Sequence, residues 1–538
     1  MNIEVLESRI APAVLTVTNI GSSGAGTLAN AISTSHAGDT IVFAHGLNGV
    51  IDVGGTALSI NHPLTIDGPG ANRIIINAEQ DSAVFQIDDF TSGGTATING
   101  LAIINGKASG SGGGIFTLDP LVLKNCVLSG NSAAAAGGAI YANTSTVTIS
   151  GCTITGNSAT GTSATFGYEG GINVLVSKSV TITNTEIIGN TAVHNGGGGF
   201  IETNTSNTAE NITLVNDVIS GNSAGKYYGG LDLKNFSTAK GAKTIVSGCT
   251  VSGNIANDGT AGGLYAGVGA FVLTNDNIVG NKATGGDGGG LYASGVRSIT
   301  ISGGRIEDNS TTDYGGGAAF VDLGTVSVTG VTFVGNSASQ TGGAIVTNNL
   351  SSFSVVGSSF VGNNANIGGG LDIKGSMTTL MSGDLIANNT AAVYGGGIHL
   401  DENASGATAT LRGCRIIGNV ALGTDGGAAF DGGTGTSIKI TGTVFSDNLA
   451  QDAGGAEFDN FASLTISAST FTGNIASLGN GGGLFLSDST GTIVTTHITG
   501  NVASDIGGGI GGASPSITFG AGDVIIGNVA PTDPNSSL

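Results

Sequence analysis

Residues 137–159 read GGAIYANTSTVTISGCTITGNSA, and this stretch contains one complete unit of the pattern that dominates the chain. It begins with a glycine pair, alternates apolar and polar residues, and ends in the phrase Thr155-Gly156-Asn157-Ser158-Ala159. Alternation with a period of two is typical of β-strands and not of amphipathic helices. Glycine and asparagine, which tolerate positive φ, mark the turns. The stretch therefore predicts three short strands, at 139–141, 146–149 and 153–155.

The same unit recurs through most of the chain. The asparagine of the closing phrase appears fifteen times, at intervals of 26 to 33 residues. A repeat of this length with three strands per period predicts a parallel β-solenoid, in which each coil pairs with the coils on either side. Because these asparagines share one turn, we expect their side-chain amides to form a structural ladder from coil to coil. The ladder comprises Asn131, Asn157, Asn190, Asn222, Asn254, Asn281, Asn309, Asn336, Asn363, Asn389, Asn419, Asn448, Asn474, Asn501 and Asn528.

The expected fold is all-β: a single right-handed parallel β-helix of about 17 coils, roughly 80 Å long. The run at 28–32, with Thr27 as a helix N-cap, predicts a short helix that covers the open N-terminal end. The expected divisions are a leader-like segment at 1–15, a cap with the first irregular coils at 16–105, regular repeats at 106–530 and a disordered tail at 531–538.

Composition excludes several classes of protein. The chain has 538 residues, of which 98 are glycine, and charged residues make up only 10%. Low charge density with a positive mean hydropathy excludes bulk disorder. The net charge of −21 without a basic cluster disfavours nucleic acid as a partner. No apolar run is long enough for a transmembrane helix, and no ordinary secretory signal is visible.

Two sets of motifs bear a family resemblance. Gly137-Gly138-Ala139-Ile140 and Gly342-Gly343-Ala344-Ile345, combined with Phe-x-x-Asn phrases such as the one at 333–336, resemble the repeats of chlamydial polymorphic outer membrane proteins. The runs at 16–19, 38–43 and 64–70 resemble the opening of bacterial surface β-helix proteins of the pectin-lyase-like superfamily, and 6–13 is similar to a leader of planctomycete and verrucomicrobial surface proteins. The resemblance implies export and display at the bacterial cell surface or in the extracellular space, commonly for adhesion.

The leading functional interpretation is therefore a secreted or cell-surface adhesin or structural rod without catalytic activity, whose partners are extracellular glycans or proteins. One alternative is a carbohydrate-active β-helix protein, either a polysaccharide lyase, a hydrolase or a glycan binder. Another is a subunit of a self-assembling extracellular fibre that associates end to end. The superfamily includes polygalacturonases, but their Asn-Thr-Asp and Arg-Ile-Lys elements do not occur here, so that chemistry is expected to be absent.

A weak catalytic candidate comes from aligning the glycine pairs. The second residue after each pair should point away from the core, which places Asp372 and His399 one coil apart. Lys374 and Asp401 follow two residues later. A carboxylate, an imidazole and an ammonium at this spacing could support acid–base chemistry. The structural alternative, which the pattern favours, is a row of solvated side chains on a strand face.

Tyr265 and Tyr292 fall in the same column in consecutive coils. Stacked aromatic rings can bind sugars, so both are candidates for glycan binding, although an aromatic ladder also stabilises a sheet without a ligand.

The cysteines indicate neither a disulfide framework nor a zinc site. Cys126, Cys152, Cys249 and Cys414 each lie five residues before a ladder asparagine, and we predict buried free thiols. No cofactor or dedicated metal site is expected. Unspecific Ca²⁺ binding at acidic turns such as 307–308 or 401–402 stays open.

Overall fold

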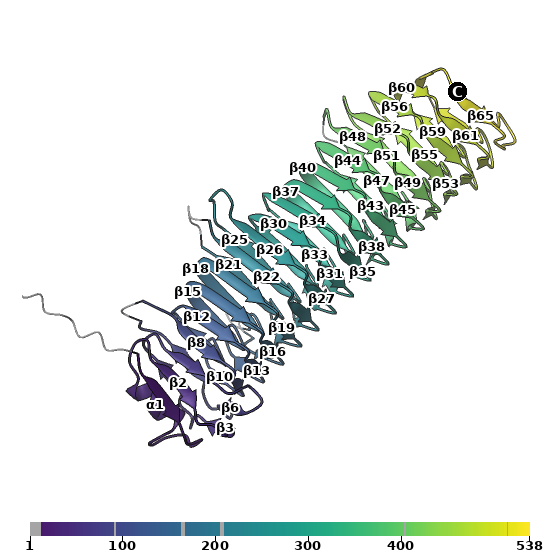
Figure 1. Ribbon diagram of the computed structural model, residues 1–538. Helices are drawn as coiled ribbons and strands as arrows, with labels where there is room; N and C mark the ends of the chain where they lie inside the picture. Colours follow the sequence, from purple (N-terminus) through teal and green to yellow (C-terminus); the bar gives the residue numbers. More distant parts are fainter. Residues whose placement is uncertain are drawn as a thin grey trace, which may run out of the picture.

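The computed structural model describes residues 12–90, 93–162, 167–204, 209–402, 405–513 and 515–537. Its parallel strands stack into one long solenoid of about 19 turns (Figure 1). The predicted fold class, an all-β parallel solenoid with three strands per coil, is confirmed. The predicted number of turns is slightly too low, because the first coils lack the asparagine phrase that identifies the others in the sequence. Most of the leader-like segment at 1–15 lies outside the described residues.

The quoted unit shows how one coil is built. Strand β15 (Ile140–Ser150) contains both of the first two predicted strands, joined through a register irregularity between Thr144 and Thr146. Strand β16 (Thr153–Thr155) is the third predicted strand. A two-residue strand, β17 (Ser158–Ala159), follows the ladder asparagine and was not predicted. Repetition of these elements generates three parallel sheets along the rod.

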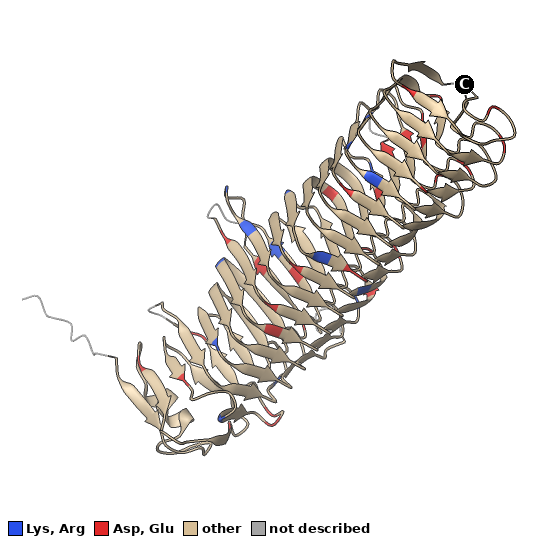
Figure 2. Cartoon of the chain, turned by 45° about the vertical axis from the view of Figure 1, so that its right-hand side comes forward, with Lys and Arg blue, Asp and Glu red and all other residues tan. Residues whose placement is uncertain are grey.

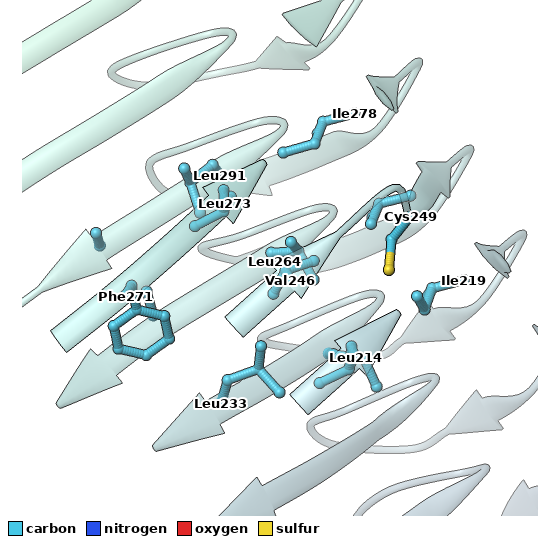
Figure 3. Packing of buried hydrophobic residues seen from close by; sticks show 14 of the residues in the cluster. Leu214, Ile219, Leu233, Val246, Cys249, Leu264, Phe271, Leu273, Ile278 and Leu291 are labelled. Atoms are coloured by element: carbon cyan, nitrogen blue, oxygen red, sulfur yellow. The ribbon is translucent and has the colours of Figure 1, made fainter. Parts of the chain in front are cut away.

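The core runs through the whole rod, because one side chain in two on each strand points inward. Leu214, Leu233, Val246 and Leu264 meet in the interior from successive coils (Figure 3). Aromatic side chains stack in the same manner; the ring centroids of Phe445 and Phe471, for example, are 4.5 Å apart. Such continuous apolar columns are the main stabilising contribution, since each coil buries its apolar side chains only against its neighbours. The four cysteines are buried and free of disulfides, as predicted.

The fifteen asparagines form one buried ladder. From Asn157 onward, each side-chain oxygen accepts hydrogen bonds from the backbone N–H and the side-chain Nδ2 of the preceding asparagine, whereas Asn131 Oδ1 accepts from the backbone N–H of Gly106. Asn336, for example, accepts from Asn309 at 3.1 and 3.0 Å. Its own Nδ2 donates to Asn363 Oδ1 at 3.0 Å and to the carbonyl oxygen of Ile306 at 2.8 Å. The ladder therefore satisfies buried backbone groups in the turns, where the strand hydrogen bonds stop.

The N-terminal end is covered by the helix α1 (Leu28–Thr34), at the purple end of Figure 1. Thr27 is its N-cap, and the Thr27 side chain accepts a hydrogen bond from the backbone N–H of Asn30 at 3.3 Å. Leu28, Ala31 and Ile32 are buried against the first coils. The helix and its cap therefore agree with the sequence pattern.

We expect Thr27→Ala to weaken this cap by about 1 kcal/mol, because the Asn30 N–H loses its acceptor. Amides of the first helical turn should then exchange with deuterium roughly fivefold faster, as read by hydrogen-exchange mass spectrometry. Thr34→Ala, at an exposed helix position, is the matched control. Equal protection in wild type and Thr27→Ala would show that the cap does not hold the helix.

The C-terminal end has an irregular last coil. Within the segment predicted as a disordered tail, Thr532 and Ser536 form parallel bridges to Ile506 and Ile510. The carbonyl oxygen of Pro534 accepts a hydrogen bond from the backbone N–H of Gly509 at 2.9 Å. In the described ranges, no helix is long and apolar enough to cross a membrane.

Candidate functional site

The candidate acid–base residues lie on three successive strands of the largest sheet. These strands are β43 (Leu371–Lys374), β47 (Ile398–Glu402) and β51 (Ala428–Gly432). Their parallel register pairs Asp372 with His399 and Lys374 with Asp401. The next strand places Asp431 beside Asp401. The β-ladder thus brings together residues that are far apart in the sequence.

A hydrogen-bonded chain links three of these side chains. His399 donates from Nδ1 to Asp372 Oδ1 at 2.5 Å, and its Nε2 lies 3.1 Å from Asp431 Oδ2. The ammonium nitrogen of Lys374 lies 3.0 Å from the other carboxylate oxygen, Asp372 Oδ2. The imidazole is therefore held at both nitrogens between two carboxylates, which fixes its orientation. Asp401, in contrast, forms no ion pair in the described part of the chain.

The expectation that these are solvated side chains is wrong for the central pair. Asp372 is fully buried, and His399 is only 3% exposed. The turn before each glycine pair folds back over the strand, so that a side chain at Gly395 would come within 2.9 Å of the His399 Cβ. The ring of Tyr394 also packs edge-on against the imidazole, with centroids 5.0 Å apart. The strand pattern correctly indicates that the residues point away from the core, but it does not show that a turn covers them.

Burial and pairing shift the pKa values of both Asp372 and His399. Burial by itself raises the pKa of Asp372, but the hydrogen bond from His399 and the charges of His399 and Lys374 outweigh it, so its pKa lies below the ordinary value. Burial lowers the pKa of His399, yet the two carboxylates outweigh this effect and raise it to about 9. At neutral pH the site therefore contains an imidazolium clamped between carboxylates.

Asp431 is the functional candidate that sequence reasoning missed. It lies two residues after Ala429, in the phase that Lys374 and Asp401 occupy in the preceding coils. Extending the alignment by one more coil would have found it. Its side chain is 44% exposed, so it connects the buried imidazole to solvent.

An open pocket of about 270 Å³ adjoins the cluster on its N-terminal side. Lys374 lines it together with Asn348, Thr341 and Tyr314. The Lys374 side chain is one-third exposed, so its ammonium faces both the pocket and the buried carboxylate. A ligand in this pocket would lie beside the Asp372 to Asp431 chain and not directly on it.

The two tyrosines proposed for glycan binding do stack. The rings of Tyr265 and Tyr292 lie 5.6 Å apart, and Tyr228, which the sequence did not single out, extends the stack with a centroid 4.5 Å from Tyr265. Burial raises the pKa of Tyr265 to about 12. Lys234 lies over this stack, 5.7 Å from the centre of the Tyr265 ring. The protein's own ammonium therefore occupies part of the aromatic surface, and a glycan role for these rings stays a prediction.

Charged side chains are otherwise dispersed. Figure 2 shows Lys and Arg spread singly along the rod, several of them beside an acidic position. Among the described residues, no group of three or more His, Cys, Asp or Glu side chains has a metal-binding arrangement.

Comparisons with known proteins bear on the fold. No protein-family model and no curated protein matches the sequence. Among solved structures, the periplasmic alginate epimerase AlgG is similar over 74% of this chain and 84% of its own, at 11% identity and a TM-score of 0.30. An α-1,3-glucanase from Streptomyces thermodiastaticus is similar over 80% of this chain and 68% of its own, at 14% identity and a TM-score of 0.34. A mannuronic acid-specific polysaccharide lyase from human gut microbiota is similar over 85% of this chain and 87% of its own, at 10% identity and a TM-score of 0.27.

The interpretation of the chain as a non-catalytic adhesin or structural rod is corrected. The three solved structures named above are an epimerase, a glucanase and a lyase, and none of them is a non-catalytic adhesin or rod; similarity at these values carries no argument about the activity of this chain. The premise of that interpretation is also wrong on the evidence of this chain. It assumed solvated polar side chains without a localised reactive group, whereas Asp372 and His399 are buried and joined to Asp431.

Proposed function

We propose that this protein is a carbohydrate-active solenoid that hydrolyses glycosidic bonds of a polysaccharide at the cluster of Asp372, His399, Asp431 and Lys374. The observation that supports the proposal is the buried Asp372–His399–Asp431 chain, which opens to solvent at Asp431. Burying ionised groups costs several kcal/mol each before their mutual attraction offsets it. Such clusters with shifted pKa values are concentrated at functional sites.

Other coils show that the solenoid does not need these charges. The same column holds Ala319 and Val346 before the cluster and Ala429 after it. All three are buried and nonpolar. Charge does recur in this column, at Asp232, which pairs with Lys234 at 3.1 Å, and at Glu457. Along the described part of the column, however, only Asp372 and His399 place a carboxylate against an imidazole.

We assign each residue of the cluster a role that is compatible with its position. His399, protonated at neutral pH, is the proton donor: its Nε2 proton can pass to the leaving glycosidic oxygen when a substrate displaces the hydrogen bond to Asp431. Asp431 accepts the proton of the attacking water, whose oxygen bonds to the anomeric carbon. The proton then returns from Asp431 to His399 Nε2 along their 3.1 Å contact, which restores the starting state. Asp372 orients the imidazole, and Lys374 neutralises Asp372.

The test is incubation of the purified chain with a panel of neutral and acidic polysaccharides, scoring new reducing ends and, separately, the ultraviolet absorbance of unsaturated ends. We expect hydrolysis of at least one polymer. Because the donor must be protonated and the pKa of His399 is raised to about 9, kcat/KM should stay high at neutral pH and fall as pH rises through about 9.

The control is Lys439→Ala, which removes an exposed lysine on a neighbouring strand of the same sheet. It should leave the profile unchanged. Detection of unsaturated ends would mean that the protein cleaves the polymer by β-elimination and not by hydrolysis. Failure to cleave any polymer would contradict the proposed activity.

A further inference from the structure

A second hollow lies far from the proposed reaction site, over the first coils of the solenoid. It has a volume of about 720 Å³. Residues from five successive coils line it, from Ala57 through Ala83, Gly110 and Ala134 to Thr160. At about 4.8 Å per coil, it extends roughly 19 Å along the rod axis. This elongated shape suits a chain-like ligand that runs along the axis.

Small residues in one turn create the hollow. The turn before the glycine pair holds Ser111 and Ala136 in these coils, and backbone hydrogen bonds from coil to coil make them equivalent to Tyr314 and Tyr394 farther along. Tyr394 packs against His399, the strand residue that follows it by five positions, whereas the small Ser111 leaves Phe116, at the same spacing, only half-buried.

An aromatic platform forms one wall of this hollow. Phe116 lines it and stacks on Tyr141 with ring centroids 5.4 Å apart and planes within 10°. Both rings are only half-buried. Unlike Tyr265, Phe116 has no ammonium over its ring in the described residues. The register places Gln86 next to Phe116 on the neighbouring strand, where its exposed amide also lines the hollow.

The lining chemistry selects an uncharged, hydroxyl-rich ligand. Among the described residues that line the hollow, two side chains are charged, Lys107 and Asp81, and their charges cancel. Since the whole chain has a net charge of −21, nothing in the hollow would compensate for bringing a polyanion there. The C–H face of a pyranose ring can pack on a ring such as Phe116, while its hydroxyls bond to amides and to serines such as Ser82 and Ser132.

We infer that this hollow is a binding site for an uncharged polysaccharide segment, remote from the proposed reaction site. Ten coil steps along one column separate Phe116 from His399, roughly 48 Å. The choice of a glycan as ligand rests on the proposed function, but binding in the hollow requires no catalysis. The site holds a polymer by its length and need not take part in bond cleavage.

The test is affinity electrophoresis in native gels that contain dextran, mixed-linkage β-glucan, galactomannan or alginate. All variants are made in a His399→Ala background, so that the polymers stay intact. We expect at least one neutral polymer to retard the protein, and Phe116→Ala to weaken that retardation about tenfold. Phe519→Ala, at an exposed phenylalanine near the other end of the same sheet, is the matched control and should bind as before.

Gln86→Ala guards against a folding defect, because the Gln86 side chain is exposed. The Gln86→Ala substitution should weaken binding of the polymer while leaving thermal unfolding unchanged. At position 116, Phe116→Tyr should restore the binding that Phe116→Ala loses. Four outcomes would each overturn the inference. They are loss of binding only in Phe519→Ala, equal binding by all variants, no retardation by any neutral polymer, and a preference for alginate. Cleavage by wild type without binding at Phe116 would overturn this site alone, whereas binding without cleavage would overturn only the proposed activity.

Discussion

The His399→Ala variant should release new glycan ends roughly 10²- to 10⁴-fold more slowly than wild type, the usual contribution of one general acid–base residue. The reason is geometric. His399 is the group that holds a proton next to Asp431, the solvent-exposed end of the hydrogen-bonded chain, and its pKa of about 9 keeps that proton in place at neutral pH. Reducing-end release under substrate-saturating and substrate-limiting conditions measures the effect on kcat and on kcat/KM.

A matched histidine separates chemistry from structure. His497, exposed on the strand β61 (His497–Thr499), is the control, and His497→Ala should retain full activity. Removing His399 leaves Asp372 facing Lys374 alone, so circular dichroism should verify that the variant is folded. A folded His399→Ala protein with wild-type activity would exclude this cluster as the reaction site.

Asn336→Ala should lower the free energy of unfolding by about 4 kcal/mol, since it deprives two buried groups of their partners. The carbonyl oxygen of Ile306 loses its donor, and the backbone N–H of Asn309 loses its acceptor. A methyl group offers neither, and the site is fully buried. Urea unfolding followed by circular dichroism measures the loss, with the midpoint expected to move to lower urea concentration.

The control for the ladder is Asn257→Ala. Asn257 is exposed and donates to the Ala224 carbonyl oxygen at 2.8 Å, outside the ladder. Its replacement should cost about 1 kcal/mol or less. Equal losses in the two variants would mean that the ladder adds nothing beyond an ordinary surface hydrogen bond.

The repeat made most of the fold predictable. A coil is a local unit whose strands, turns and inward side chains follow from alternation and from glycine and asparagine positions. The stacking partner of each coil is the next coil, so register follows from the period. This is why the ladder position of Asn157 and the pairing of Asp372 with His399 could be read along the chain.

The structure was harder to predict from the sequence where a segment departs from the repeated pattern. The two-residue strand β17 is too short to have a periodicity of its own, and the irregular first coils lack the asparagine phrase by which coils were counted. The position of Asp431 follows from the same alignment of the coils, but only when the alignment is extended by one more coil.

The sequence by itself determined the solenoid, its capping helix and the column in which each outward residue lies, because these depend on neighbours in the chain and on a regular period. Only the tertiary structure decided which outward residues are buried. Tyr394 and the backbone at Gly395 cover His399, while the small turn residue Ser111 leaves the face beside Phe116 open. Burial depends on how a turn from one segment packs over a strand, and it is burial that converts a polar pair into a site with shifted pKa values.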